Sequence, residues 1–305
     1  MSKAGAVAPD PTMIGNVVEP PFARLPDPAT LFSARAQRFE TLAQGHQLEP
    51  YLRFLGHLCD CQHHVQDRLP DVDMPTAAAL AQAREHAMPA LDRGHFTTDA
   101  ACDATLERLF TLAADIEMPD TARAALTRVR AADAAARDEM VRSVLADSIP
   151  VETMAEHVYV AAALQVHFAR MASRLDAKAL VPVGDGACPS CGGAPVASAV
   201  VGWQGAHGAR FCTCSLCATQ WHVVRIKCVL CSSTEGIAYQ ELEGGNSNVK
   251  AETCEKCHGY VKILHQQKDA GLEPVADDVA SLGLDLLLRE SGYRRGAVNP
   301  FLLGY

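Results

Sequence analysis

Several features that mark common protein classes are missing from this 305-residue sequence. No apolar run approaches the ~18 residues that a membrane helix needs, and residues 1–16 lack the apolar core of a signal peptide. The sequence also has no glycine-rich phosphate loop, no nucleophile elbow and no paired-carboxylate signature. We therefore expect a cytoplasmic protein with no membrane insertion and no evident catalytic site.

The sequence also has fewer positively charged than negatively charged residues. The chain has 27 Lys and Arg residues against 36 Asp and Glu residues, and its net charge of -9 argues against a general nucleic-acid binder. The deficit is uneven, because residues 1–187 carry a net charge of -8 and residues 188–265 carry +1 with no Asp at all. This shift indicates a large acidic N-terminal part followed by a near-neutral part of different composition.

Cysteine is rare in most of the chain and concentrated in one region. Nine of the twelve cysteines lie between residues 188 and 257. In a reducing cytosol, clustered cysteines more often bind metal or perform redox chemistry than form structural disulfides. Eight of them form four Cys-x-x-Cys pairs. The pairs fall into two sets, and within each set 22 residues separate the first pair from the second: Cys188/Cys191 from Cys214/Cys217, and Cys228/Cys231 from Cys254/Cys257. The whole pattern recurs after 40 residues, which is an internal repeat.

The spacing predicts two tetracysteine metal sites, one per repeat. Two residues between cysteines allow a tight turn to aim both sulfurs at one ion, and a second pair on another hairpin completes a tetrahedron. A module of ~40 residues cannot bury enough apolar surface to fold unaided, so a metal is expected to stabilise it. Four thiolates favour zinc or iron, and ribbon-type and rubredoxin-type sites share these ligands, so both metals stay open.

Redox dithiols are the alternative to metal ligands for the four Cys-x-x-Cys pairs, but the matched spacing of the pairs favours metal.

The remaining cysteines show weaker evidence of a functional role. Cys212 has Glu252 as its counterpart in the repeat, so we expect a packed thiol and keep a redox role as the alternative. Cys59 and Cys61 flank opposite edges of a helical stripe and cannot share an ion, whereas Cys59 and His63 lie one turn apart. Helix packing is the favoured interpretation of Cys59.

The rest of the chain predicts helices around this region. Six amphipathic helices begin at cap or proline signals such as Asp27, Thr76 and Asp99, the fifth runs through residues 122–144, and the sixth runs from Ser148 to about Leu180. Short β-branched stretches at 196–201 and 221–226 suit hairpins, and 275–291 returns to helix. The predicted fold is a mainly α N-terminal domain, two tandem rubredoxin-like or zinc-ribbon β modules and a C-terminal helix. Its divisions are a loose arm (1–25), the helical domain (26–182), two metal modules (183–225 and 226–270) and a helix with tail (271–305).

The segment Trp221–Lys227 joins the two predicted modules. Its alternation places Trp221, Arg225 and Lys227 on one face of a strand. One interpretation is a strand half-buried between the modules, and the other is a basic, aromatic strip that binds a partner. His157 and His167, on the sixth helix, have no thiol or carboxylate arranged around them in the sequence, so we expect ordinary buried histidines.

Nearly the whole chain resembles a known family, the formate dehydrogenase accessory proteins called FdhE. The resemblance rests on strings near the N-terminus, around the cysteines and near the C-terminus: Leu25-Pro-Asp-Pro-Ala-Thr-Leu-Phe32, Tyr51-Leu-Arg-Phe-Leu55 with Gln62-His63, Cys188-Pro-x-Cys-Gly192, Cys214-Ser-Leu-Cys217, Trp221-His-Val-Val-Arg-Ile-Lys-Cys228, Cys254-x-x-Cys-His-Gly-Tyr260, Glu273-Pro-Val-Ala-Asp-Asp278, Gly292-Tyr-Arg-Arg295 and Asn299-Pro-Phe-Leu-Leu303. Cys59, Cys61 and Cys212 fall outside the family pattern.

The resemblance implies a cytoplasmic, non-enzymatic biogenesis factor. Such proteins bind the molybdenum-containing catalytic subunit of respiratory formate dehydrogenase before export and are required for its activity. The resemblance also implies a helical domain with two rubredoxin-like modules, and iron with an optional redox role. Two other functions stay open, a nucleic-acid-binding zinc ribbon and a redox or sulfur-handling catalyst that uses metal-bound thiolates. Six Lys and Arg residues in 188–265 are few for a nucleic-acid ribbon.

Overall fold

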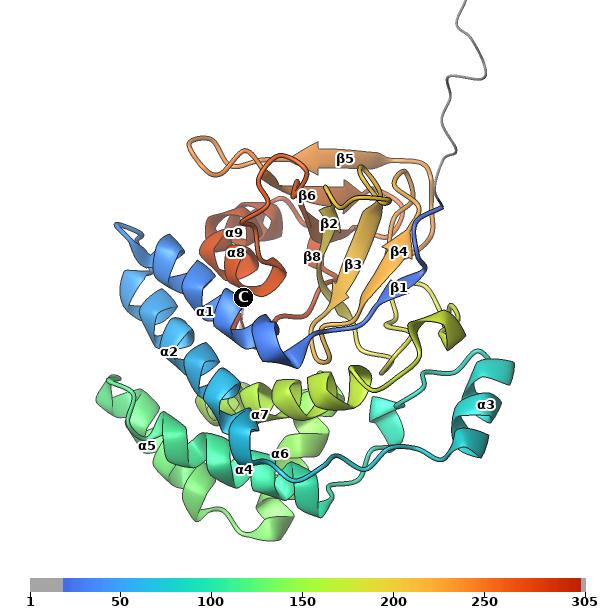
Figure 1. Ribbon diagram of the computed structural model, residues 1–305. Helices are drawn as coiled ribbons and strands as arrows, with labels where there is room; N and C mark the ends of the chain where they lie inside the picture. Colours follow the sequence, from blue (N-terminus) through green and yellow to red (C-terminus); the bar gives the residue numbers. More distant parts are fainter. Residues whose placement is uncertain (1–18, 303–305) are drawn as a thin grey trace, which may run out of the picture.

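The computed structural model describes residues 19–302, and it places a layer of helices beside a mixed β-sheet (Figure 1). Residues 1–18 of the predicted N-terminal arm lie outside the described residues. The end of that arm is ordered into structure, because Ala23–Arg24 form strand β1 and pair with Trp221 and Gln220. No helix within residues 19–302 is both long and apolar enough to cross a membrane.

The N-terminal layer contains seven α-helices. The predicted cap residues Asp27, Thr76 and Asp99 each accept a hydrogen bond from an amide in the first turn of the helix that follows. Helix α7 is buried along most of its length and forms the centre of the layer, with α4, α5 and α6 packed around it. The helices are α1 (Pro28–Ala43), α2 (Glu49–His64), α3 (Ala77–Glu85), α4 (Ala100–Ala113), α5 (Asp120–Ala131), α6 (Ala134–Leu145) and α7 (Met154–Ala172).

Three predicted helices differ from the structure. The fifth is two helices, because the Asp133 side chain accepts a hydrogen bond from the Ala136 amide and starts α6 anew. The sixth begins at Met154 after a 3-10 turn and ends at Ala172, well before Leu180. The C-terminal helix breaks at Ser281 into α8 (Pro274–Ala280) and α9 (Leu282–Glu290). A buried lysine, Lys262, donates to the carbonyls of Asp278 at 2.8 Å and Ser281 at 3.2 Å beside the break.

The two predicted β modules form one sheet rather than two separate units. The strand order is β1-β4-β3-β2-β7-β6-β5, with β8 paired to β7. Each repeat contributes an antiparallel meander, and the first strand of one meets the last strand of the other in a parallel pair, Ser198 opposite Ile263. The strands are β2 (Pro195–Val200), β3 (Arg210–Cys214), β4 (Gln220–Val223), β5 (Ile237–Gln240), β6 (Val249–Cys254), β7 (Gly259–Leu264) and β8 (Arg294–Arg295).

Helix α8 connects the sheet to the helical layer. It packs against β2 on one side and α1 on the other. Two ion pairs cross the second contact, Arg35 with Glu273 at 2.9 Å and Arg38 with Asp277 at 2.6 Å. The main hydrophobic core is accordingly continuous from the helices through α8 into the sheet. The fold class predicted from the sequence is confirmed, but its parts share one core.

Candidate metal sites

Site 1 consists of Cys188, Cys191, Cys214 and Cys217, and site 2 of Cys228, Cys231, Cys254 and Cys257. In each site the four sulfurs lie within 4.8 Å of one another. The closest sulfur pairs are 3.4 Å and 3.6 Å apart in site 1 and 3.7 Å and 3.9 Å apart in site 2. A tetrahedron with metal–sulfur bonds of ~2.3 Å has sulfur–sulfur edges of about 3.8 Å, so both sets fit a zinc or iron ion.

The backbone that aims these sulfurs repeats at all four cysteine pairs. The residue directly after the second cysteine of each pair has a positive φ: 77° at Gly192, 58° at Ala218, 62° at Ser232 and 52° at His258. This left-handed conformation closes the Cys-x-x-Cys turn, as in the bond from the Gly192 amide to the Cys188 carbonyl at 2.8 Å. Three of the four positions are not glycine, so the residue type indicated this left-handed conformation only at Gly192.

In the second Cys-x-x-Cys turn of site 1, backbone amide groups point at the sulfur of Cys214. The Leu216 and Cys217 amides both donate to Cys214 Sγ at 3.4 Å. Hydrogen bonds of this kind stabilise a thiolate over a thiol, and a thiolate is the form that binds metal. The Cys217 sulfur lies 3.2 Å from Thr219 Oγ1, which in turn donates to Ser190 Oγ at 2.9 Å. The ligands therefore have a surrounding shell of hydrogen bonds that fixes their orientation.

Site 1 is enclosed by the helical layer. All four of its cysteines are buried. The segment before α4 lies across the first turn. There the Leu91 amide donates to the Ser190 carbonyl at 2.7 Å, and the Arg93 amide donates to the Cys191 carbonyl at 3.1 Å. The buried Gln165 of α7 donates to the Ser215 carbonyl at 2.8 Å in the second turn. Removal of the metal would therefore disturb the contact between the sheet and the helices.

Site 2 is open on one side. Cys228 and Cys254 are buried, whereas Cys231 and Cys257 are exposed. The closed side is formed by the C-terminal segment, where the Arg294 amide donates to the His258 carbonyl at 2.8 Å. The two sites therefore share ligands and turns but differ in the access that solvent has to the sulfurs.

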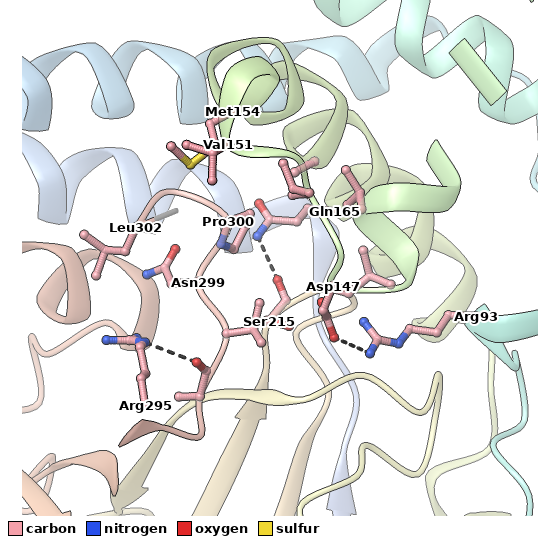
Figure 2. Close-up of a pocket in the computed structure, with 16 residues that line it drawn as sticks. Arg93, Asp147, Val151, Met154, Gln165, Ser215, Arg295, Asn299, Pro300 and Leu302 are labelled. Atoms are coloured by element: carbon pink, nitrogen blue, oxygen red, sulfur yellow. Dashed lines mark hydrogen bonds and ion pairs between the residues drawn. The ribbon is translucent and has the colours of Figure 1, made fainter. Parts of the chain in front are cut away.

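A cavity of about 280 Å³ lies beside the second turn of site 1, between the start of α7 and the C-terminal segment (Figure 2). Its floor includes Ser215 and Leu216. The charged side chains in its lining are already paired, Arg93 with Asp147, and Arg295 with two aspartates of α8 and α9. The cavity therefore presents apolar side chains, the polar side chains of Gln165, Ser215 and Asn299, and charges that are already paired.

Comparison with known proteins agrees with the two-site architecture. Models of the FdhE family match the chain in three parts, the N-terminal domain at residues 20–185, the central domain at 187–225 and the C-terminal domain at 226–302. An FdhE homolog of Rhizobium meliloti (strain 1021) is 48% identical over 301 residues, which is 98% of each chain. This chain belongs to the FdhE family.

Other members of the family are less similar in sequence but match this chain over nearly its whole length. An FdhE homolog of Edwardsiella ictaluri (strain 93-146) is 34% identical over 99% of this chain and 94% of its own. The crystal structure of the FdhE protein from Pseudomonas aeruginosa matches with a TM-score of 0.83 at 33% identity, over 93% of this chain and 99% of the other. The resemblance inferred from the sequence is confirmed, and the matched structure supports the fold described above.

Three residues of the C-terminal strings that resemble FdhE, Asp278, Arg295 and Asn299, join Lys262 and Asp285 in a buried polar network. Lys262 of β7 contacts Asp285 at 2.5 Å and Asp278 at 3.2 Å, and Arg295 of β8 binds the same two carboxylates. Asn299 donates to Asp278 at 2.8 Å. Two cations and two anions balance within a region from which water is excluded, so loss of any one would leave a buried charge. These FdhE residues therefore hold α8, α9 and β8 against the second half of the sheet.

The cysteines outside the two sites do not gather around a third ion. Among residues 19–302, no histidine, cysteine or carboxylate set other than sites 1 and 2 brings three or more ligand atoms together. Burial raises the pKa of Cys61 to about 11 and that of Cys212 to about 12, so both thiols are protonated at neutral pH. Cys59 of α2 is fully buried in the main hydrophobic core, in agreement with the interpretation as a helix-packing residue. These observations weaken the case for redox chemistry at Cys212.

The two histidines of α7 are buried, as expected. The Nδ1 atom of His157 lies 2.7 Å from the Thr153 carbonyl. His167 contacts the rings of both Phe96 and Phe168, and burial lowers the pKa of its imidazole. Both are structural residues in the helical core of this FdhE chain.

The Trp221–Lys227 segment differs from the predicted alternating strand. Strand β4 ends at Val223, and Trp221 is 4% exposed because it lies in the sheet between β1 and β3. Arg225 is exposed and Lys227 half-buried in the loop that follows. The structure therefore separates the indole from the two basic residues, whose role in partner binding stays a prediction.

Proposed function

We propose that this FdhE chain is a non-enzymatic maturation factor that binds the catalytic subunit of a molybdenum-containing respiratory formate dehydrogenase. The observation that carries the proposal is family membership over nearly the whole chain, because the matched ranges 187–225 and 226–302 each contain one tetracysteine set. The proposed place of action is the cytoplasm. The proposed units are the helical domain (26–182), two metal modules (183–225 and 226–270) and the C-terminal helix and tail (271–305).

We also propose that each site holds one iron or zinc ion. The sulfur–sulfur distances fit either metal, and the donor set of four thiolates excludes magnesium and calcium. Such an ion would cross-link two Cys-x-x-Cys turns and add folding energy to each half of the sheet. Metal analysis with a visible spectrum separates the two, since a ferric tetrathiolate is coloured and bleaches on reduction, whereas a zinc protein stays colourless.

An anaerobic affinity capture from the native cells tests the proposed function. The tagged chain is expected to recover a formate dehydrogenase catalytic subunit, and cells that lack the chain are expected to lose formate dehydrogenase activity. A Cys191→Ser variant should not restore that activity, whereas the matched control Cys61→Ser should, because Cys61 lies outside both sites. Intact activity in the deletion strain, or recovery of nucleic acid in place of the subunit, would contradict the proposal.

A further inference from the structure

Three large apolar side chains are exposed near one another beside site 2. Val224 and Ile226, in the loop after β4, are 55% and 70% exposed, and Tyr239 of β5 is 48% exposed. Isolated exposed apolar residues are ordinary, but a group of them on one surface indicates an interaction site. Hydrogen bonds between the loop, β3, β6 and β5 bring these residues to one part of the surface.

A buried ion pair holds these residues together. Arg210 of β3 donates to Glu252 of β6 at 2.7 Å and to the Lys227 carbonyl in the loop at 3.4 Å. Tyr239 in turn donates its hydroxyl proton to Glu252 at 3.1 Å. The loop and Tyr239 are thus fixed to the same two side chains, one on each half of the sheet.

This face of the sheet is the one away from the C-terminal helices. Ala251 of β6 and Tyr260 of β7 pack against Leu284 and Leu288 of α9. Side chains alternate between the two faces of a strand, so Glu252 points to the opposite face from Ala251. Helices α8 and α9 therefore leave the Glu252 face to the loop 224–227 and to solvent.

The loop carries Arg225 and Lys227 in a chain whose net charge is -9. Within residues 19–302, Arg225, Lys227 and Lys268 have no carboxylate within ion-pair distance, whereas Lys250 contacts Glu241 at 2.6 Å. Lys268 lies beside His265, because its amide donates to the His265 carbonyl at 2.9 Å. Burial and then the charges of Lys268, Lys250 and Arg225 lower the pKa of this imidazole. Unpaired cations beside exposed apolar side chains are complementary to an acidic partner with apolar side chains.

We propose that this basic-apolar patch, defined as Val224, Arg225, Ile226, Tyr239 and Lys268, docks an acidic segment of the formate dehydrogenase catalytic subunit that also carries apolar side chains. The proposal rests on the proposed function and names the surface used. Two exposed branched aliphatic residues favour protein over nucleic acid, which is bound by denser basic faces and stacking rings. Trp221 is not part of the patch, because it is buried.

Binding of the full-length chain to the purified catalytic subunit tests the patch. Ile226→Asp and the double variant Arg225→Glu/Lys268→Glu are each expected to raise the Kd by at least about tenfold. Wild-type binding is expected to weaken as salt is added, and the charge-reversed variant is expected to lose that salt dependence. Val151→Asp is the matched apolar control, since Val151 is also 70% exposed but precedes α7. Arg130→Glu on α5 is the control for charge reversal. Metal content and melting temperature show that each variant is folded.

The outcomes separate the patch from the proposed function. Weakened binding in the patch variants with wild-type binding in both controls supports the patch. Equal binding by all variants overturns the patch and leaves the proposed function intact. No binding by the wild-type chain overturns both, and patch-dependent binding of nucleic acid in place of the subunit overturns the choice of partner.

Discussion

Site 1 and site 2 come from the same 40-residue repeat, with the same four ligands and the same left-handed residue after each pair. Their surroundings come from segments that do not repeat. The helical layer donates backbone and side-chain hydrogen bonds to the turns of site 1, whereas two cysteines of site 2 remain exposed. The repeat therefore sets how each metal would be held, and the rest of the chain sets how accessible it is.

The largest expected effect comes from removal of site 1. The double variant Cys188→Ser/Cys217→Ser should lower the free energy of unfolding by more than about 4 kcal/mol, the value for loss of a metal present at a thousand times its Kd. The helices should loosen too, because Leu91, Arg93 and Gln165 bond to the turns of this site. Urea unfolding followed by far-UV circular dichroism measures the change.

The matching variant of site 2 is Cys228→Ser/Cys257→Ser. It should leave the helical signal and its urea midpoint close to wild type, because no helix of the N-terminal layer donates to these turns within the described residues. Equal losses of helical stability in the two double variants would show that the comparison between the sites is wrong.

The second prediction concerns the ion pair that joins the two halves of the sheet. Arg210→Met should lower the free energy of unfolding by about 3 kcal/mol, because Glu252 would be left charged and buried. The double variant Arg210→Met/Glu252→Met should recover most of this loss, since neither charge remains. Glu241→Gln, in the more exposed Lys250–Glu241 pair, is the control and should unfold at the wild-type urea concentration.

The third prediction uses a chelator to compare metal release. Metal release from the chain should have two phases of equal amplitude, one for each site. Release from site 2 should be at least about tenfold faster than release from site 1, which corresponds to an activation barrier lower by about 1.4 kcal/mol. A chromogenic chelator under anaerobic conditions follows both phases. Cys191→Ser should keep the fast phase and Cys231→Ser the slow one, and a single phase in the wild-type chain would argue against unequal access.

The smallest expected effect is at Cys212, the counterpart of Glu252 in the repeat. Cys212→Ala should cost about 1 kcal/mol of stability through the lost buried sulfur and leave metal content and formate dehydrogenase activity unchanged. Burial raises the pKa of this thiol to about 12, so it has little thiolate to offer as a nucleophile. Loss of activity in a variant with both metals in place would instead assign Cys212 a redox role.

The helix starts and the metal ligands were predictable because each depends on a few neighbouring residues. Asp27 and Thr76 cap their helices through bonds to amides two or three residues away, and each Cys-x-x-Cys turn is equally local. The breaks at Asp133 and Ser281 were missed because the apolar pattern continues through them. The Ser281 carbonyl also accepts a hydrogen bond from Lys262, a contact 19 residues away in sequence that no local pattern records.

The sequence by itself determined the ligands of both sites, their spacing and the membership of the chain in the FdhE family, since these are properties of residue type and order. The tertiary structure decided that the two modules share one sheet, that Trp221 is buried and that only site 2 is open. Those outcomes depend on contacts between segments far apart in the chain, such as Gln165 with Ser215 and Arg210 with Glu252. No local pattern records such contacts, because burial is set by whatever packs against a segment.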